Sequence, residues 1–149
     1  RLAAQVGVAD WVRFEGQRPD AERYYAAADL FVLPTLYDPF ANACLEAMAC
    51  GLPVLTSVAN GAAELLQDGV NGCVLKDPLS VEALGASLRG LLPLERRQEL
   101  GQAGYQTTCE YPLSKALAQT LSVYEAALGT PHPHPLPEGE GVSGRQRGC

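Results

Sequence analysis

The chain has 149 residues, a net charge of -6 at pH 7 and a 47% share of hydrophobic residues. This length suits one domain, and the acidic balance argues against a nucleic-acid partner, which would require a basic surface. No run of about 18 apolar residues is present and no signal-peptide pattern opens the chain, so we predict neither a transmembrane segment nor export.

Strand and helix patterns alternate along the chain, as they do in an α/β protein with a doubly wound parallel sheet. Residues 1–8 read as the tail of an amphipathic helix without a start signal, so we expect a segment to precede them. In chain order, we expect strands at 12–15, 30–33, 54–56 and 72–75, and helices at 21–28, 43–50, 62–67, from the Ser80 cap toward 92, at 95–107 and at 114–128.

The end of the chain changes in composition after Gly129 and becomes rich in proline and glycine. We therefore predict one domain at 1–129 and a disordered tail at 130–149. His132 and His134 lie in this tail without a third ligand nearby, so no metal site is predicted there. The last helix carries an apolar residue every three or four positions, which predicts that one face packs on the chain's own sheet or, as the alternative, against a further domain.

Five cysteines are scattered without C-x-x-C spacing, and their odd number argues against a disulfide framework. A reducing compartment fits best, so we predict a cytoplasmic protein. Cys44, Cys50 and Cys73 are interpreted as small core residues.

The most distinctive stretch follows the apolar run 30–33, which suits a buried parallel strand. A loop leads to Asn42, a favourable N-cap residue, and Gly51 followed by Pro53 gives the stop signal of the next helix. Asp38 therefore lies in the loop, and Glu46 lies in the opening turns of the helix.

Two kinds of group come together at this helix start. Free backbone amides at Ala43, Cys44 and Leu45, with the positive end of the helix dipole, would suit a diphosphate. The carboxylates of Asp38 and Glu46 would repel phosphate, but they suit the vicinal hydroxyls of a ribose or a hexose. The pattern predicts a site for a phosphorylated, hydroxyl-rich ligand.

The spacing Asp38-x7-Glu46, followed by LEAMA-x-G-x-PV from Leu45 to Val54, resembles the E-x7-E signature of retaining family-4 glycosyltransferases (glycosyl transferases group 1). Further similar stretches lie at residues 12–16, 24–34 and 60–72. The resemblance implies a Rossmann-like domain, the donor-binding C-terminal half of a GT-B fold, incomplete at its N-terminus and extended by C-terminal helices.

The resemblance also implies roles for individual residues. Asp38 would be the catalytic-site residue that contacts the transferred hexose, Glu46 would hold the ribose, and Arg18 would border the nucleotide base unless it is a solvated loop arginine. Asp38 replaces the usual Glu and Ala41 the usual Gly, so we expect a changed donor preference. The backbone amides assigned to the sugar and the diphosphate are those of Phe40, Ala41, Asn42, Ala43, Cys44 and Leu45.

The implied function is transfer of a hexose from a nucleotide diphosphate sugar to a glycan or lipid-linked acceptor hydroxyl with retention, in bacterial lipopolysaccharide or cell-surface polysaccharide biosynthesis. A UDP-sugar is the favoured donor, and no cofactor or metal is implied. The family comparison places the acceptor site on a missing N-terminal domain, so we expect the isolated chain to be inactive and its parent enzyme to be peripheral at the inner membrane face. The alternatives are a non-catalytic nucleotide-binding fragment and a nucleotide-sugar epimerase.

Overall fold

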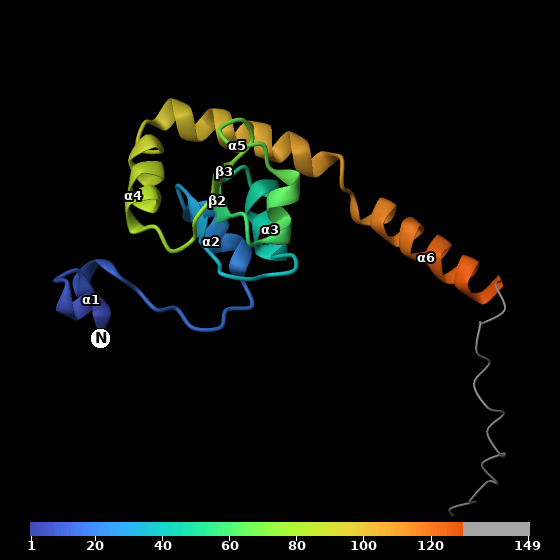
Figure 1. Cartoon of the computed structure of the whole chain (residues 1–149), viewed down its shortest axis with the longest axis horizontal. Helices are drawn as coiled ribbons and strands as arrows, with labels where there is room; N and C mark the ends of the chain where they lie inside the picture. The colour runs from blue at the N-terminus through green and yellow to red at the C-terminus, as the bar shows by residue number, and fades with distance from the viewer. Residues whose placement is uncertain (130–149) are drawn as a thin grey trace, which may run out of the picture. The chain divides into compact units, whose positions relative to one another are not determined.

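A computed structural model of the chain describes residues 1–129 (Figure 1). It consists of two units, one at Arg1–Glu110 and one that begins at Tyr111. The predicted disordered tail, with both histidines, lies outside the described residues. Among residues 1–129, none of the helices is long and apolar enough to cross a membrane.

A parallel sheet of three strands lies at the centre of the first unit, in the order β1-β2-β3. In register, Val32 of β1 pairs with Leu55 of β2, and Thr56 of β2 pairs with Val74 of β3. All four residues of the middle strand are buried, as expected for a parallel strand between neighbours. The predicted α/β class with a parallel sheet is confirmed. The strands are β1 (Phe31–Leu33), β2 (Val54–Ser57) and β3 (Cys73–Leu75).

Most helices form within two residues of their predicted bounds. Ser80 caps α4 as expected, since its hydroxyl accepts a hydrogen bond from the Ala83 amide at 3.1 Å. The helix predicted at 62–67 is a short 3₁₀ helix, and it ends at Leu65 because the chain becomes extended at Leu66. The helices are α1 (Leu2–Gln5), η1 (Ala9–Trp11), α2 (Ala21–Ala27), α3 (Asn42–Ala49), η2 (Gly61–Leu65), α4 (Val81–Gly90), α5 (Leu94–Cys109) and α6 (Leu113–Gly129).

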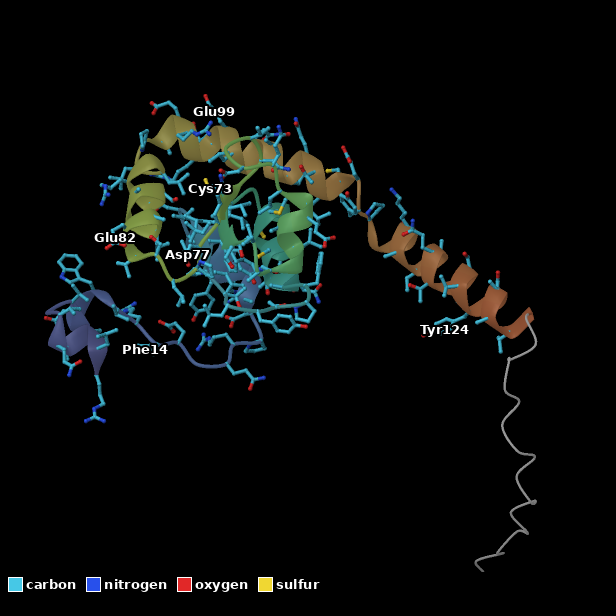
Figure 2. The ribbon with its side chains drawn as sticks, in the orientation of Figure 1. Phe14, Cys73, Asp77, Glu82, Glu99 and Tyr124 are labelled. Atoms are coloured by element: carbon cyan, nitrogen blue, oxygen red, sulfur yellow. The ribbon has the colours of Figure 1, made fainter. Side chains whose placement is uncertain are left out.

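The strand predicted at 12–15 does not form. These residues are exposed, and the Phe14 side chain, labelled in Figure 2, is 90% accessible to solvent. A strand exists only through hydrogen bonds to a neighbouring strand. Within residues 1–129, β1 pairs only with β2 and no strand pairs with this segment. A short alternation of apolar and charged residues is therefore insufficient to form a strand without its sheet neighbour.

The core divides between the two faces of the sheet because successive residues of a strand point to opposite sides. On one face, Val54 packs in a cluster with Cys44 and Met48 of α3. On the other face, Leu55 packs in a second cluster with Leu91 and Leu100, next to apolar residues of α4. The sheet is thus covered on both faces, as in a doubly wound fold.

The cysteines differ from the prediction at one position. Cys44 is fully buried and Cys73 is half-buried, but Cys50 is exposed. Cys50 lies six residues, or about 1.7 helical turns, beyond Cys44, so it faces away from the core that Cys44 enters.

Helix α6 belongs to the second unit and is described by itself. The predicted helix is confirmed, and its side chains Leu117, Leu121 and Tyr124 are exposed. Tyr124 is labelled in Figure 2. The packing expected for this face stays a prediction.

Candidate functional site

The loops that follow β1 and β2 are joined by backbone hydrogen bonds at the carboxyl edge of the sheet. The Asp38 amide donates to the Ala59 carbonyl at 3.0 Å, and the Gly61 amide donates to the Asp38 carbonyl at 2.9 Å. Open α/β sheets bind their ligands at this edge. The backbone of Asp38 is therefore held in place by the loop after the neighbouring strand.

Asn60 is the centre of this connection and is 1% exposed. Its side-chain oxygen accepts from the Ala41 amide at 3.1 Å and from the Ala62 amide at 3.0 Å. Its side-chain nitrogen donates to Thr56 Oγ1 at 2.9 Å and contacts Cys44 Sγ at 3.4 Å. One buried amide group thus links the start of α3, the end of β2 and η2.

Replacing Asn60 with alanine is expected to lower the free energy of unfolding by about 1–3 kcal/mol, because the buried amides of Ala41 and Ala62 lose their acceptor. Urea denaturation of both proteins measures this difference. Asn42→Ala is the matched control, since Asn42 is exposed and is not the cap of α3. Equal losses in the two variants would contradict the role assigned to Asn60.

Gly61 lies against the loop that carries Asp38. A Cβ atom built at Gly61 would lie 1.8 Å from the carbonyl oxygen of Pro39, a distance that no side chain tolerates. The close approach of these two backbones therefore requires glycine at this position.

The Asp38 side chain is half-buried and shapes its own loop. Its Oδ1 atom accepts a hydrogen bond from the Phe40 amide at 3.0 Å, which closes a local turn. Within residues 1–129, no hydrogen bond to the second oxygen, Oδ2, is formed. One oxygen thus orients the carboxylate, and the other accepts no hydrogen bond within the described part of the chain.

The start of α3 differs in detail from the prediction. The helix begins at Asn42, its N-cap residue is Ala41, and no side chain caps it, so the predicted Asn42 cap is wrong by one position. Asn60 accepts a hydrogen bond from the amide of the N-cap residue Ala41 and so holds the start of the helix from another loop.

The amides near the start of α3 are only partly available to a ligand. Those of Phe40 and Ala41 bond the side chains of Asp38 and Asn60, as described above. The Cys44 amide, predicted to be free, donates to the Ala41 carbonyl at 2.9 Å. Leu45 is the fourth helical residue, and the availability of its amide stays a prediction. The amides of Asn42 and Ala43 lie in the first turn, where no carbonyl of the helix can accept their hydrogen bonds. These two amides therefore suit an anion.

Glu46 lies in the second turn of α3 with an exposed side chain. Its Oε2 atom accepts a hydrogen bond from the Tyr25 hydroxyl of α2 at 3.0 Å. Burial, followed by the hydrogen bond to Glu46, raises the pKa of Tyr25 to about 12, so the phenol keeps its proton. Both side chains line a pocket of about 470 Å³, whose other walls come from Pro19, Ala21, Glu22, Ala49 and Cys50.

Arg18 does not join Glu46 in this pocket. Its guanidinium pairs with Asp20 at 3.3 Å and lies over the Tyr24 ring, 5.6 Å from the centroid. The pocket that it lines, of about 310 Å³, contains neither Asp38 nor Glu46. The structure therefore places Arg18 beside the first turn of α2.

Sequence reasoning missed three contributors to the site: Asn60, Gly61 and Tyr25. Asn60 and Gly61 lie in a stretch that carried the resemblance, and their Asn-Gly pair after a strand was the available signal. Tyr25 gave no local signal, since its partner Glu46 is 21 residues away. A further pocket of about 410 Å³ borders the same loops and is lined by Val58, Asn60, Gly61, Ala63, Glu64, Leu66, Asp68, Val74 and Lys76.

The chain belongs to the family described as Glycosyl transferases group 1, which matches residues 1–107. Its fold is the Rossmann-like fold of the GT-B glycosyltransferases. The predicted family and fold class are confirmed at this level.

Several known proteins are similar to the chain. A D-inositol 3-phosphate glycosyltransferase of Thermobispora bispora is 35% identical over 134 residues, which cover 88% of this chain and 31% of the relative. The lipopolysaccharide core biosynthesis glycosyltransferase LpsE of Rhizobium meliloti is 31% identical over 108 residues, which cover 72% of this chain and 32% of LpsE. The crystal structure of Anabaena Alr3699/HepE in complex with UDP-glucose superposes with a TM-score of 0.73 at 28% identity, covering 81% of this chain and 35% of that one. The chain spans about a third of the length of these curated relatives.

Proposed function

We propose that this chain is the donor-binding part of a retaining hexosyltransferase of the family-4 type, which uses a UDP-sugar. Asp38 contacts hydroxyls of the transferred hexose, Glu46 accepts hydrogen bonds from the ribose, and the amides of Asn42 and Ala43 receive the diphosphate. The acceptor is a glycan or a lipid-linked sugar in bacterial lipopolysaccharide or surface-polysaccharide synthesis.

One observation carries this proposal: the loop of Asp38, the start of α3 and Glu46 form a single structure fixed at the carboxyl edge of a parallel sheet. Asn60 and Gly61 hold that structure from the neighbouring loop. Two carboxylates that flank an available pair of helix amides along the chain match a ligand that carries both hydroxyls and phosphate.

The donor and the pathway rest on the relatives. Alr3699/HepE is described in complex with UDP-glucose, which supports a uridine donor. LpsE is named for lipopolysaccharide core biosynthesis, which supports an envelope glycan as the product. We place the whole enzyme in the cytoplasm, and at the inner face of the membrane when its acceptor is lipid-linked.

The proposed reaction needs no protein nucleophile and no cofactor. The bond between the anomeric carbon and the diphosphate oxygen breaks, the acceptor oxygen bonds to that carbon on the same face, and the acceptor proton passes to the departing phosphate. This chain contributes positioning of the hexose and stabilisation of the departing diphosphate. Arg18 is proposed to border the base only if its pairing with Asp20 opens.

Isothermal titration with UDP, UDP-glucose and GDP-mannose tests the proposal on the 149-residue chain. Glu46→Ala is expected to weaken binding of the preferred donor about tenfold to a hundredfold, because hydrogen bonds to a charged acceptor contribute about 1.5–3 kcal/mol. Glu82→Ala, on α4 and outside the site (Figure 2), is the matched control and should bind like the parent chain.

Four results are informative in this titration and in an assay for product. A loss confined to Glu46→Ala supports the assignment, and an unchanged affinity rejects it. Donor binding without product is the expected behaviour of this chain, since it spans about a third of its curated relatives. No binding of any nucleotide to a folded chain would reject the donor site.

A further inference from the structure

We infer that Tyr25 is a positioning residue that holds the Glu46 carboxylate in the orientation required to receive the ribose hydroxyls of the donor. This inference rests on the proposed function and adds to it a residue on a different helix. The juxtaposition is between the second turn of α3 and the middle of α2.

The Tyr25 ring is held in place by packing contacts that do not involve Glu46. It packs edge-on against Phe31 of β1, with ring centroids 6.0 Å apart and an interplanar angle of 66°. It also borders the core cluster that contains Met48 and Val54. A ring seated against the sheet has few rotamers available, so its hydroxyl is held at a defined position.

Glu46 needs such a partner because it is exposed. A free glutamate on a helix surface samples several rotamers, and binding a ligand through one of them costs conformational entropy. The hydrogen bond from Tyr25 to Oε2 selects one orientation before the ligand arrives. Pre-organisation of this kind improves affinity without adding a contact to the ligand.

The geometry leaves Glu46 able to bind. Tyr25 occupies one carboxylate oxygen, and a carboxylate offers about four acceptor positions. Both residues line the pocket of about 470 Å³ between α2 and α3. Tyr25 thus acts through Glu46, and a ligand in this pocket meets a carboxylate whose direction is already set.

The phenol remains a donor over the working pH range. With its pKa raised to about 12 by burial and by Glu46, Tyr25 stays protonated in neutral and mildly alkaline solution. The ionisable groups that face it are Glu46 and Cys44 of α3 and Cys50, which directly follows that helix. From its own helix, Glu22 lines the same pocket.

Tyr25→Phe tests the inference because it removes the hydroxyl and keeps the ring against Phe31. Titration of the full chain with UDP-glucose is expected to show about threefold to tenfold weaker binding, the range for one hydrogen bond. Tyr24→Phe is the matched control: the neighbouring tyrosine donates to Glu15, also at 3.0 Å, and should bind like the parent chain. In the Glu46→Ala background, Tyr25→Phe should cause no further loss.

The double variant separates positioning from a purely structural role. An equal loss from Tyr25→Phe with and without Glu46 would overturn the inference, and so would unchanged binding by Tyr25→Phe while Glu46→Ala loses the donor. In that second case the proposed function stands. If the parent chain binds no donor, both the function and the inference fail.

A measurement without ligand tests the hydrogen bond itself. In an NMR titration of tyrosine Cζ atoms, Tyr25 should titrate near 12 in the parent chain and at a lower pH in Glu46→Gln. Titration of Tyr25 at its ordinary value in the parent chain would overturn the inference.

Discussion

Replacing Gly61 with alanine is expected to lower the free energy of unfolding by about 3 kcal/mol, the upper end of the range for overpacking. The added methyl group would lie 1.8 Å from the Pro39 carbonyl oxygen and 2.8 Å from its carbonyl carbon. Both atoms are backbone, so neither can move aside as a flexible side chain would. Either the loop of Asp38 or the loop after β2 must shift.

The stability loss is measured by urea denaturation, with Gly90→Ala as the matched control. Gly90 ends α4, and a Cβ atom there would meet nothing within 4 Å. The control should be neutral or slightly stabilising, because alanine restricts the unfolded chain. A Gly61→Ala protein as stable as Gly90→Ala would show that the two loops do not approach as described.

Donor binding should fall with the same substitution. Gly61 bonds the Asp38 carbonyl, so a displaced loop would move the Asp38 carboxylate and the start of α3 together. This links the stability of the edge of the sheet to the proposed site.

Replacing Leu100 with alanine is expected to cost about 2–5 kcal/mol, the usual range for a buried leucine whose cavity does not collapse. Leu100 is 0% exposed and packs in the cluster with Leu55 of β2 and Leu91. Its loss would open a cavity between α5 and Leu55 of β2.

Thermal and urea unfolding of Leu100→Ala and Leu92→Ala measure this difference. Leu92 follows α4 and is 71% exposed, so its truncation should change stability by less than about 0.5 kcal/mol. Similar effects at the two leucines would mean that α5 does not cover the sheet through Leu100.

Helix α3 shows how much of the fold local sequence predicts. Its end was predicted from Gly51, which indeed adopts a positive φ of 75°, while its amide bonds the Met48 carbonyl at 2.9 Å. Ser80 likewise caps α4 through a residue three positions away. These capping interactions join residues within one helical turn, so they do not depend on the position of distant segments.

The start of α3 shows where local reasoning fails. The sequence favours Asn42 as the cap, but the cap residue is Ala41, and its amide donates to Asn60, which lies 19 residues further along the chain. The strand prediction at 12–15 is wrong for a related reason, since a strand forms only when another strand lies beside it. Both outcomes depend on partners that spacing along the chain does not reveal.

The candidate site likewise combines features that local sequence predicts with features that it does not. The positions of Asp38 in a loop and Glu46 on the following helix came from sequence, because turn and helix signals act over a few residues. The partners that hold those carboxylates, Gly61 behind the loop and Tyr25 beside Glu46, came only from the tertiary structure. They are set by the packing of segments more than 20 residues apart, and that packing depends on burial and on hydrogen bonds between distant segments.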